Sequence, residues 1–212
     1  LAALGVSYIV WRRPVVRAAS PLSENPHTHA RIRRNAISAG LCETVHMSFA
    51  GIDALKTFEV NFDDAVALEN PLSLAVSHLR PTLLPGILST ASLNVRRGAE
   101  CVRLFEIGPV FLPGNPPKEE LRQAVVLAGK SRPDHFSDKA RPADFFDLKG
   151  IVERILETSG RCSVPAEYVP AQVAVFESGA SAAIMAGGAT IGCMGRIASK
   201  VVAAFELPAA LY

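Results

Sequence analysis

The chain has 212 residues, of which 49% are hydrophobic and 20% are charged, and its formal net charge is +2. This composition supports a packed core and excludes a globally disordered chain, and so small a net charge does not by itself indicate nucleic-acid binding. No apolar run reaches the roughly 18–20 residues that cross a membrane, so we expect no membrane partner.

Residues 1–26 are predicted to be the end of a preceding domain and a linker, because a proline-rich stretch follows an apolar one. We therefore expect a piece of a longer protein, with one domain over residues 27–212. The first 40 residues carry six arginines against a single acid, Glu24. This excess indicates either a solvated surface or contact with a polyanion, for which the candidates are Arg31, Arg33 and Arg34.

A helix is predicted over residues 27–41, where polar residues recur at helical spacing on one face. A strand is predicted over residues 43–49, where polar and apolar residues alternate. The apolar side of this helix contains Ile32, Ile37 and Leu41. The apolar side of this strand contains Val45, Met47 and Phe49.

A second helix, over residues 82–97, leads into the central strand, over residues 101–107. Leu84 and Leu88 belong to the apolar stripe of this helix. The strand is apolar on both faces, which is typical of the middle of a covered sheet. Arg103 and Glu106 are an odd number of positions apart, so we expect them to face opposite sides of the sheet.

The rest of the chain predicts an α+β domain with a mainly antiparallel sheet flanked by helices. The polar segment 130–142 predicts a mobile surface loop, and Gly187-Gly188 predicts a hairpin turn. Further strands are predicted at 121–129, 166–169, 173–176, 181–185 and 190–194, and further helices at 144–160 and 198–205.

No residues have the spacing of a known catalytic, cofactor or metal site, so we predict none. The histidines lack a Ser, Cys or Asp partner at motif spacing. The four cysteines form no CxxC pair, which favours a reduced intracellular protein. Asp144 and Asp147 are better explained as helix-start residues than as metal ligands. Glu106 has either a functional role or a structural pairing with a neighbouring arginine.

Three motifs resemble one known family. NPLS…HLRPTLLPGIL, VRLFEIGPVF and DFFDLKGIVERIL are similar to segments of the β subunits of bacterial phenylalanine–tRNA ligases. The resemblance implies the core-like domain of a class II aminoacyl-tRNA synthetase fold. In catalytic members of that fold, an arginine after the strand matching 102–111 binds the ATP phosphate. This chain has Leu112-Pro113-Gly114-Asn115 there, and GCMGRIASK does not support a second anchor at Arg196.

The resemblance therefore implies a non-catalytic domain of a cytoplasmic complex that makes phenylalanyl-tRNA during translation. The expected partners are the α subunit, in an α2β2 heterotetramer, and tRNA(Phe). ATP and Mg²⁺ are expected at the α subunit. The expected contacts with the α subunit are Ile32, Ile37, Leu41, Leu84 and Leu88. The alternative is a free-standing synthetase-like enzyme that activates an amino acid with Arg103 or Arg122.

Overall fold

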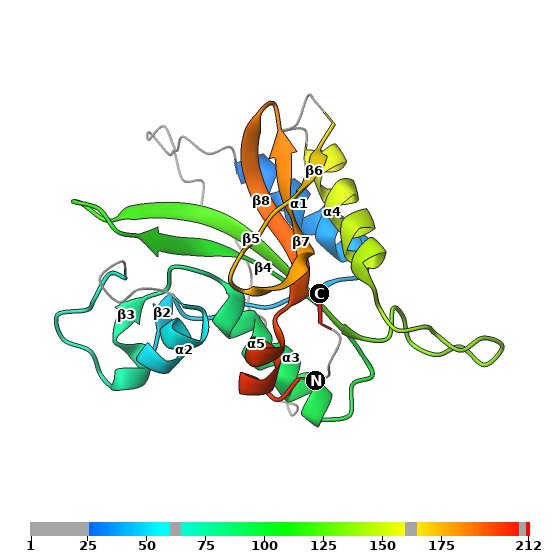
Figure 1. Ribbon diagram of the computed structural model, residues 1–212, viewed down its shortest axis with the longest axis horizontal. Helices are drawn as coiled ribbons and strands as arrows, with labels where there is room; N and C mark the ends of the chain where they lie inside the picture. The colour runs from blue at the N-terminus through cyan, green and yellow to red at the C-terminus, as the bar shows by residue number, and fades with distance from the viewer. Residues whose placement is uncertain (1–25, 60–64, 160–164, 208–210) are drawn as a thin grey trace, which may run out of the picture.

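The computed structural model describes residues 26–59, 65–159, 165–207 and 211–212 (Figure 1). The predicted preceding domain and linker therefore lie almost entirely outside the described residues. The helices are α1 (Pro26–Ser38), α2 (Ile52–Thr57), the 3-10 helix η3 (Leu74–Val76), α3 (Leu84–Arg96), α4 (Phe145–Ser159) and α5 (Ser199–Ala204). The strands are β1 (Cys42–Glu43), β2 (Phe49–Ala50), β3 (His78–Leu79), β4 (Cys101–Leu112), β5 (Lys118–Gly129), β6 (Glu167–Pro170), β7 (Phe176–Ala186) and β8 (Ala189–Ile197).

Two three-stranded sheets form the middle of the molecule, in the orders β1-β4-β5 and β6-β7-β8. All their pairings are antiparallel except that of β1 with β4, which is parallel. Residues 211–212 join the two sheets. Tyr212 N donates to Leu127 O at 3.0 Å, and Ile197 N donates to Leu211 O at 2.9 Å. The expected mainly antiparallel architecture is confirmed, with β2 and β3 forming a separate small sheet.

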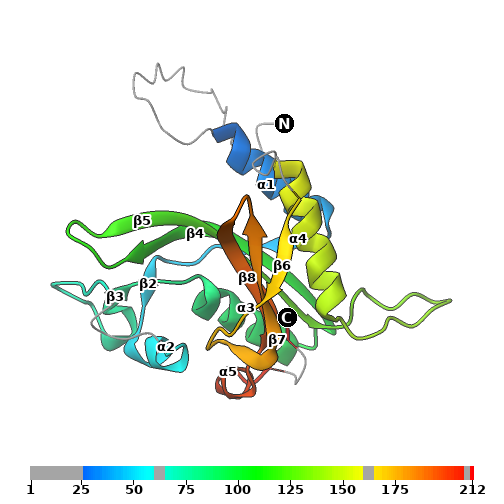
Figure 2. The same ribbon diagram turned by 45° about the horizontal axis from the view of Figure 1, so that its top comes forward.

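Helices cover both sides of this layer, with α1 and α4 on one side and α3 and α5 on the other (Figure 2). Val102 and Leu104 of β4 pack into the core on the α3 side, and Phe105 packs into the core on the α1 and α4 side. Arg103 lies on the same side as Phe105 and donates to Ser131 O at 2.7 Å and to Ala39 O at 3.0 Å. Glu106 faces α3, so the predicted separation of these two charges is confirmed.

The predicted strand over residues 43–49 is wrong in its middle. Regular pairing stops at Glu43 and resumes at Phe49. Between them the backbone makes isolated bonds, from Thr44 N to Phe105 O at 2.8 Å and from Arg80 N to Ser48 O at 3.0 Å. At His46 the partners are side chains, because Glu106 accepts from His46 N at 3.3 Å and Arg80 Nη1 donates to His46 O at 3.5 Å. Side-chain partners therefore replace the ladder at His46.

The predicted end of the central strand at residue 107 is also wrong, because Gly108-Pro109 does not interrupt it. The strand continues to Leu112 and pairs with β5 along its whole length. A proline is tolerated there because β1 pairs only with Leu104 and Phe105, so Pro109 needs no donor toward that side.

The segment 130–142 folds back on itself as a hairpin-like arm, which projects from the body in both views (Figures 1 and 2). Ser131 N donates to Arg141 O at 2.9 Å, and His135 N donates to Asp138 O at 3.0 Å. The predicted turn at Gly187-Gly188 is confirmed, since both residues have positive φ angles and lie between β7 and β8. None of the helices in the described part of the chain is long and apolar enough to span a membrane.

Candidate functional site

The most enclosed charged group in the described structure is the carboxylate of Glu106, which is 1% exposed. An isolated buried carboxylate is strongly unfavourable, so its stability depends on its hydrogen-bond and ion-pair partners. Arg80 Nη1 donates to Oε1 at 2.7 Å, and His46 Nδ1 lies 2.7 Å from Oε2. Each carboxylate oxygen therefore has a close polar partner. The predicted pairing of Glu106 with an arginine is confirmed. The arginine, Arg80, comes from the segment before α3 and not from a neighbouring strand of the sheet.

Arg80 is itself 5% exposed and connects three segments. Its Nε donates to Pro109 O at 2.9 Å, and its backbone N donates to Ser48 O at 3.0 Å. A Cβ atom at residue 108 would lie 2.3 Å from Arg80 Nη2. Any larger residue at position 108 would therefore force the buried guanidinium to shift.

His46 completes the cluster through both ring nitrogens. Its Nε2 lies 2.8 Å from Thr90 Oγ1 on α3. If Nδ1 carries the proton for Glu106, Nε2 accepts from the threonine hydroxyl. The ring lies against the start of α3, where a Cβ at Gly86 would come within 2.7 Å of His46 Cγ.

Thr90, His46 and Glu106 have the order of contacts of a hydroxyl–imidazole–carboxylate triad. Sequence reasoning missed this arrangement because the residues come from three distant segments with no motif spacing. Hydrolysis also needs free donors for a developing oxyanion. Thr90 lies inside α3, where the backbone N–H groups bond within the helix, and Arg80 also binds the Glu106 carboxylate. The geometry therefore fits a structural cross-link better than a hydrolytic centre.

The arginines considered for phosphate binding are engaged elsewhere. Arg103 faces the opposite side of β4 from Glu106. Arg122 pairs with Glu120 at 2.9 Å, and Arg196 pairs with Glu177 at 3.2 Å. Within the described residues, no group of three His, Cys, Asp or Glu side chains could hold a metal ion.

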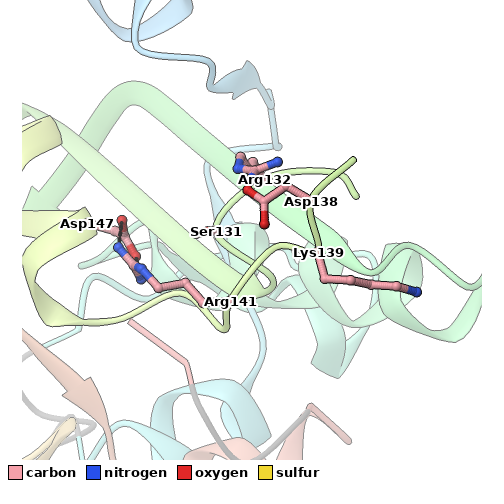
Figure 3. Close-up of a pocket in the computed structure, with 6 residues that line it drawn as sticks. All are labelled: Ser131, Arg132, Asp138, Lys139, Arg141 and Asp147. Atoms are coloured by element: carbon pink, nitrogen blue, oxygen red, sulfur yellow. Dashed lines mark hydrogen bonds and ion pairs between the residues drawn. The ribbon is translucent and has the colours of Figure 1, made fainter. Parts of the chain in front are cut away.

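A polar cavity of about 530 Å³ lies at the base of the projecting arm (Figure 3). It is lined by Ser131, Arg132, Asp138, Lys139, Arg141 and Asp147. Arg141 binds Asp147 through two hydrogen bonds of 2.7 and 2.8 Å, and these bonds hold the pKa of Asp147 below its ordinary value. Arg132 pairs with Asp138. These pairs occupy both acids of the lining, and the remaining cation, Lys139, lies 4.0 Å from Asp134 and points largely into solvent.

The predicted nucleic-acid contacts all lie on α1. Arg31 and Arg34 are exposed, and Arg33 binds Glu43 at 2.7 Å.

The predicted role at the N-terminus of α4 is confirmed for Asp144, whose Oδ1 accepts from Phe146 N at 2.8 Å and Asp147 N at 3.0 Å.

The five predicted subunit contacts are mostly turned inward. Leu41 is 3% and Leu88 0% exposed, both in the chain's own core. Ile32 and Leu84 are partly buried against the same cores. Ile37, at 54%, is the exposed member of the set.

Exposed apolar side chains occur instead on the segment after β1 and on β5. Val45 is 84% and Met47 71% exposed, and Leu121 of β5 is 41% exposed. Val45 and Met47 flank His46 in the sequence, and their side chains are largely exposed, whereas the His46 ring contacts Glu106 and Thr90. On β4, Pro109 lies directly opposite Leu121, and Ile107 is on the same face, where it is partly buried against the core. We call these five residues (Val45, Met47, Ile107, Pro109 and Leu121) the outer sheet face.

Comparisons with known proteins agree on one family. A family model described as "Phenylalanyl tRNA synthetase beta chain CLM domain" matches residues 9–212. The phenylalanine–tRNA ligase beta subunit of Xanthomonas campestris is 32% identical over 90% of this chain and 24% of its own length. That of Pasteurella multocida is 35% identical over 79% of this chain and 21% of its own length. The chain thus spans about a quarter or less of these relatives.

Solved structures show the same fold at low identity. Pyrrolysyl-tRNA synthetase from Desulfitobacterium hafniense superposes with a TM-score of 0.67 at 16% identity, covering 87% of this chain and 63% of that one. A second structure of that synthetase, PylSc, gives 0.65 at 16% identity, over 87% and 61% of the two chains. The predicted class II synthetase core-like fold is confirmed.

Replacing Glu106 tests the buried cluster. Glu106→Ala is expected to lower the free energy of unfolding by about 3–5 kcal/mol, because it leaves Arg80 as an uncompensated buried charge. Urea denaturation measures this loss. The exposed acid Glu119 of β5 provides the control, and Glu119→Ala should change stability by less than about 0.5 kcal/mol. Equal losses in the two variants would contradict the structural role of the cluster.

Proposed function

Because the chain belongs to the family of the phenylalanyl-tRNA synthetase beta chain CLM domain, we propose that it is a non-catalytic scaffold within a phenylalanine–tRNA ligase. In this proposal the domain docks the α subunit of a cytoplasmic α2β2 complex that forms phenylalanyl-tRNA in translation. ATP and Mg²⁺ bind at the α subunit.

The observation that carries this proposal is the outer sheet face. Large apolar side chains that lie together on a surface are characteristic of protein interaction sites. Val45 and Met47 are each more than two-thirds exposed. The relatives are named beta subunits, which points to another subunit as the occupant. We therefore assign the docking role to this face together with Ile37, in place of the inward-facing leucines.

The charge distribution supports the absence of catalysis in this chain. Adenylate formation needs fixed positive groups beside the phosphates. The turn between β4 and β5 contains no arginine or lysine from Leu112 to Pro117. Arg122 and Arg196 each pair with a carboxylate. The alternative enzyme would need Arg103 or Arg122, and Arg103 donates to two backbone carbonyls on the far side of β4.

We propose a smaller role for α1 in tRNA(Phe) binding. Arg31 and Arg34 are exposed on this helix, and exposed guanidinium groups are suited to contacts with a phosphate backbone. Arg33 is partly buried and binds Glu43.

Polar substitutions on the outer sheet face test the docking proposal. In the full-length β subunit, Val45→Ser and Met47→Ser should each weaken binding to the α subunit by about tenfold or more, because each buried apolar side chain contributes about 1.5–3 kcal/mol. Sedimentation of mixed subunits measures the affinity. Phe136, which is 96% exposed at the tip of the arm, supplies a matched control. Phe136→Ser should bind normally, and unchanged binding by Val45→Ser and Met47→Ser would refute the assignment.

Calorimetry and pyrophosphate exchange separate the scaffold from the alternative enzyme. We expect the β subunit alone neither to bind ATP at micromolar affinity nor to exchange pyrophosphate in the presence of phenylalanine. The assembled complex is the positive control. Exchange by the β subunit alone, lost on Arg122→Gln, would favour the enzyme.

Salt dependence tests the role of α1. Arg31→Ala and Arg34→Ala in the assembled complex should each reduce the salt slope of tRNA binding by about 0.7–1, the value for one lost phosphate contact. Filter binding over a series of salt concentrations measures the slope. The exposed Arg97, after α3, supplies the control. A slope that Arg31→Ala and Arg34→Ala leave unaltered would exclude a phosphate contact by α1.

A further inference from the structure

The segment that carries Val45 and Met47 leaves the regular sheet just before it reaches them. β1 pairs with β4 at Cys42 and Glu43, and the next backbone bond runs from Thr44 N to Phe105 O at 2.8 Å. The outward direction of Val45 and Met47 therefore depends on contacts other than a continuing strand ladder.

His46, between those two residues, provides the strongest of these contacts. Its ring lies 2.7 Å from Glu106 Oε2 on β4 and 2.8 Å from Thr90 Oγ1 on α3. Its backbone N donates to Glu106 Oε1 at 3.3 Å, and its carbonyl accepts from Arg80 Nη1 at 3.5 Å. Both the side chain and the backbone of one residue are thus tied to buried, rigid elements.

We infer that His46 is a positioning residue for subunit docking. By drawing its ring toward Glu106 and Thr90, it turns the flanking side chains to the opposite side, where they form the exposed edge of the outer sheet face. This inference rests on the proposed function, since it takes the α subunit as the occupant of that face.

A fixed position matters because an interface gains affinity when its contact residues are already held in the bound arrangement. If the ring contacts are lost, residues 45–47 keep their apolar side chains but sample other conformations before docking. The affinity then falls although no residue of the interface has been replaced.

Four variants of the full-length β subunit test the inference. His46→Ala removes both ring contacts, and Thr90→Val removes the α3 contact with little change in volume. His46→Asn keeps a donor that can reach Glu106. His135→Ala, on the exposed arm, is the control. The measurements are affinity for the α subunit, thermal unfolding, and hydrogen exchange of the amides of residues 45–47.

We expect His46→Ala to weaken α-subunit binding by about tenfold, the effect of losing a hydrogen bond to a charged group. Exchange of the amides at 45–47 should rise in parallel. Thr90→Val should give a smaller loss, His46→Asn should recover part of the affinity, and His135→Ala should match the unaltered protein.

The outcomes separate this inference from the proposed function. If Val45→Ser and Met47→Ser weaken binding but His46→Ala does not, the positioning role is wrong and the docking face stands. If none of the three weakens binding, both are wrong. Should His46→Ala fail to fold, Thr90→Val decides, and unchanged affinity and exchange in that variant overturn the positioning role.

Discussion

The ion pair between Arg80 and Glu106 is the interaction on which the arrangement of this domain depends. Both side chains are nearly fully buried, so each would be strongly destabilising without the other. The surrounding bonds tie the segment before α3, the central strand and the stretch after β1 to one point. A glycine at position 108 keeps the space that this contact requires. The cluster thus fixes three segments relative to one another where regular sheet pairing has ended.

The central strand β4 positions this cluster, because the two faces of the strand pack against different helices. One face packs against α3 and α5, and the other packs against α1 and α4. Past the helices, the α1 side continues as the outer sheet face, where Val45 and Met47 are largely exposed and Ile107 is partly buried against the core. The alternation along β4 that buries Phe105 also places Ile107 and Pro109 on this side. The core and the surface that we propose for docking are therefore consecutive parts of the same side of the sheet.

Periodicity predicted most of the fold. The helix before β4, the central strand, its opposed charges and the turn at Gly187-Gly188 follow from local spacing, and the structure confirms them. Periodicity could not predict whether an apolar helix face packs into the chain's own core or against a partner. Leu41 and Leu88 belong to regular stripes, yet their own core covers them. Spacing indicates that a side chain will be buried but does not say whether the same chain or a partner buries it.

The polar cluster could not be predicted for a related reason. His46, Thr90 and Glu106 are far apart in sequence, and each has an ordinary local explanation. Their meeting depends on how β4 and α3 pack, which no local pattern encodes. Regular pairing is absent between Glu43 and Phe49, and side chains bond the backbone of His46 there, so the alternating pattern overestimated the strand.

The backbone bonds of Leu211 and Tyr212, which connect the two sheets, affect the order in which the domain folds. These residues bond to β5 and to the end of β8, although β5 precedes them by a large part of the chain. Contacts between such distant segments form late, because a long loop must close first. During synthesis, the hairpin of β4 and β5 leaves the ribosome with one edge still unpaired. At Leu127 and Ala128 that edge stays open to incorrect pairing until residues 211–212 have been made.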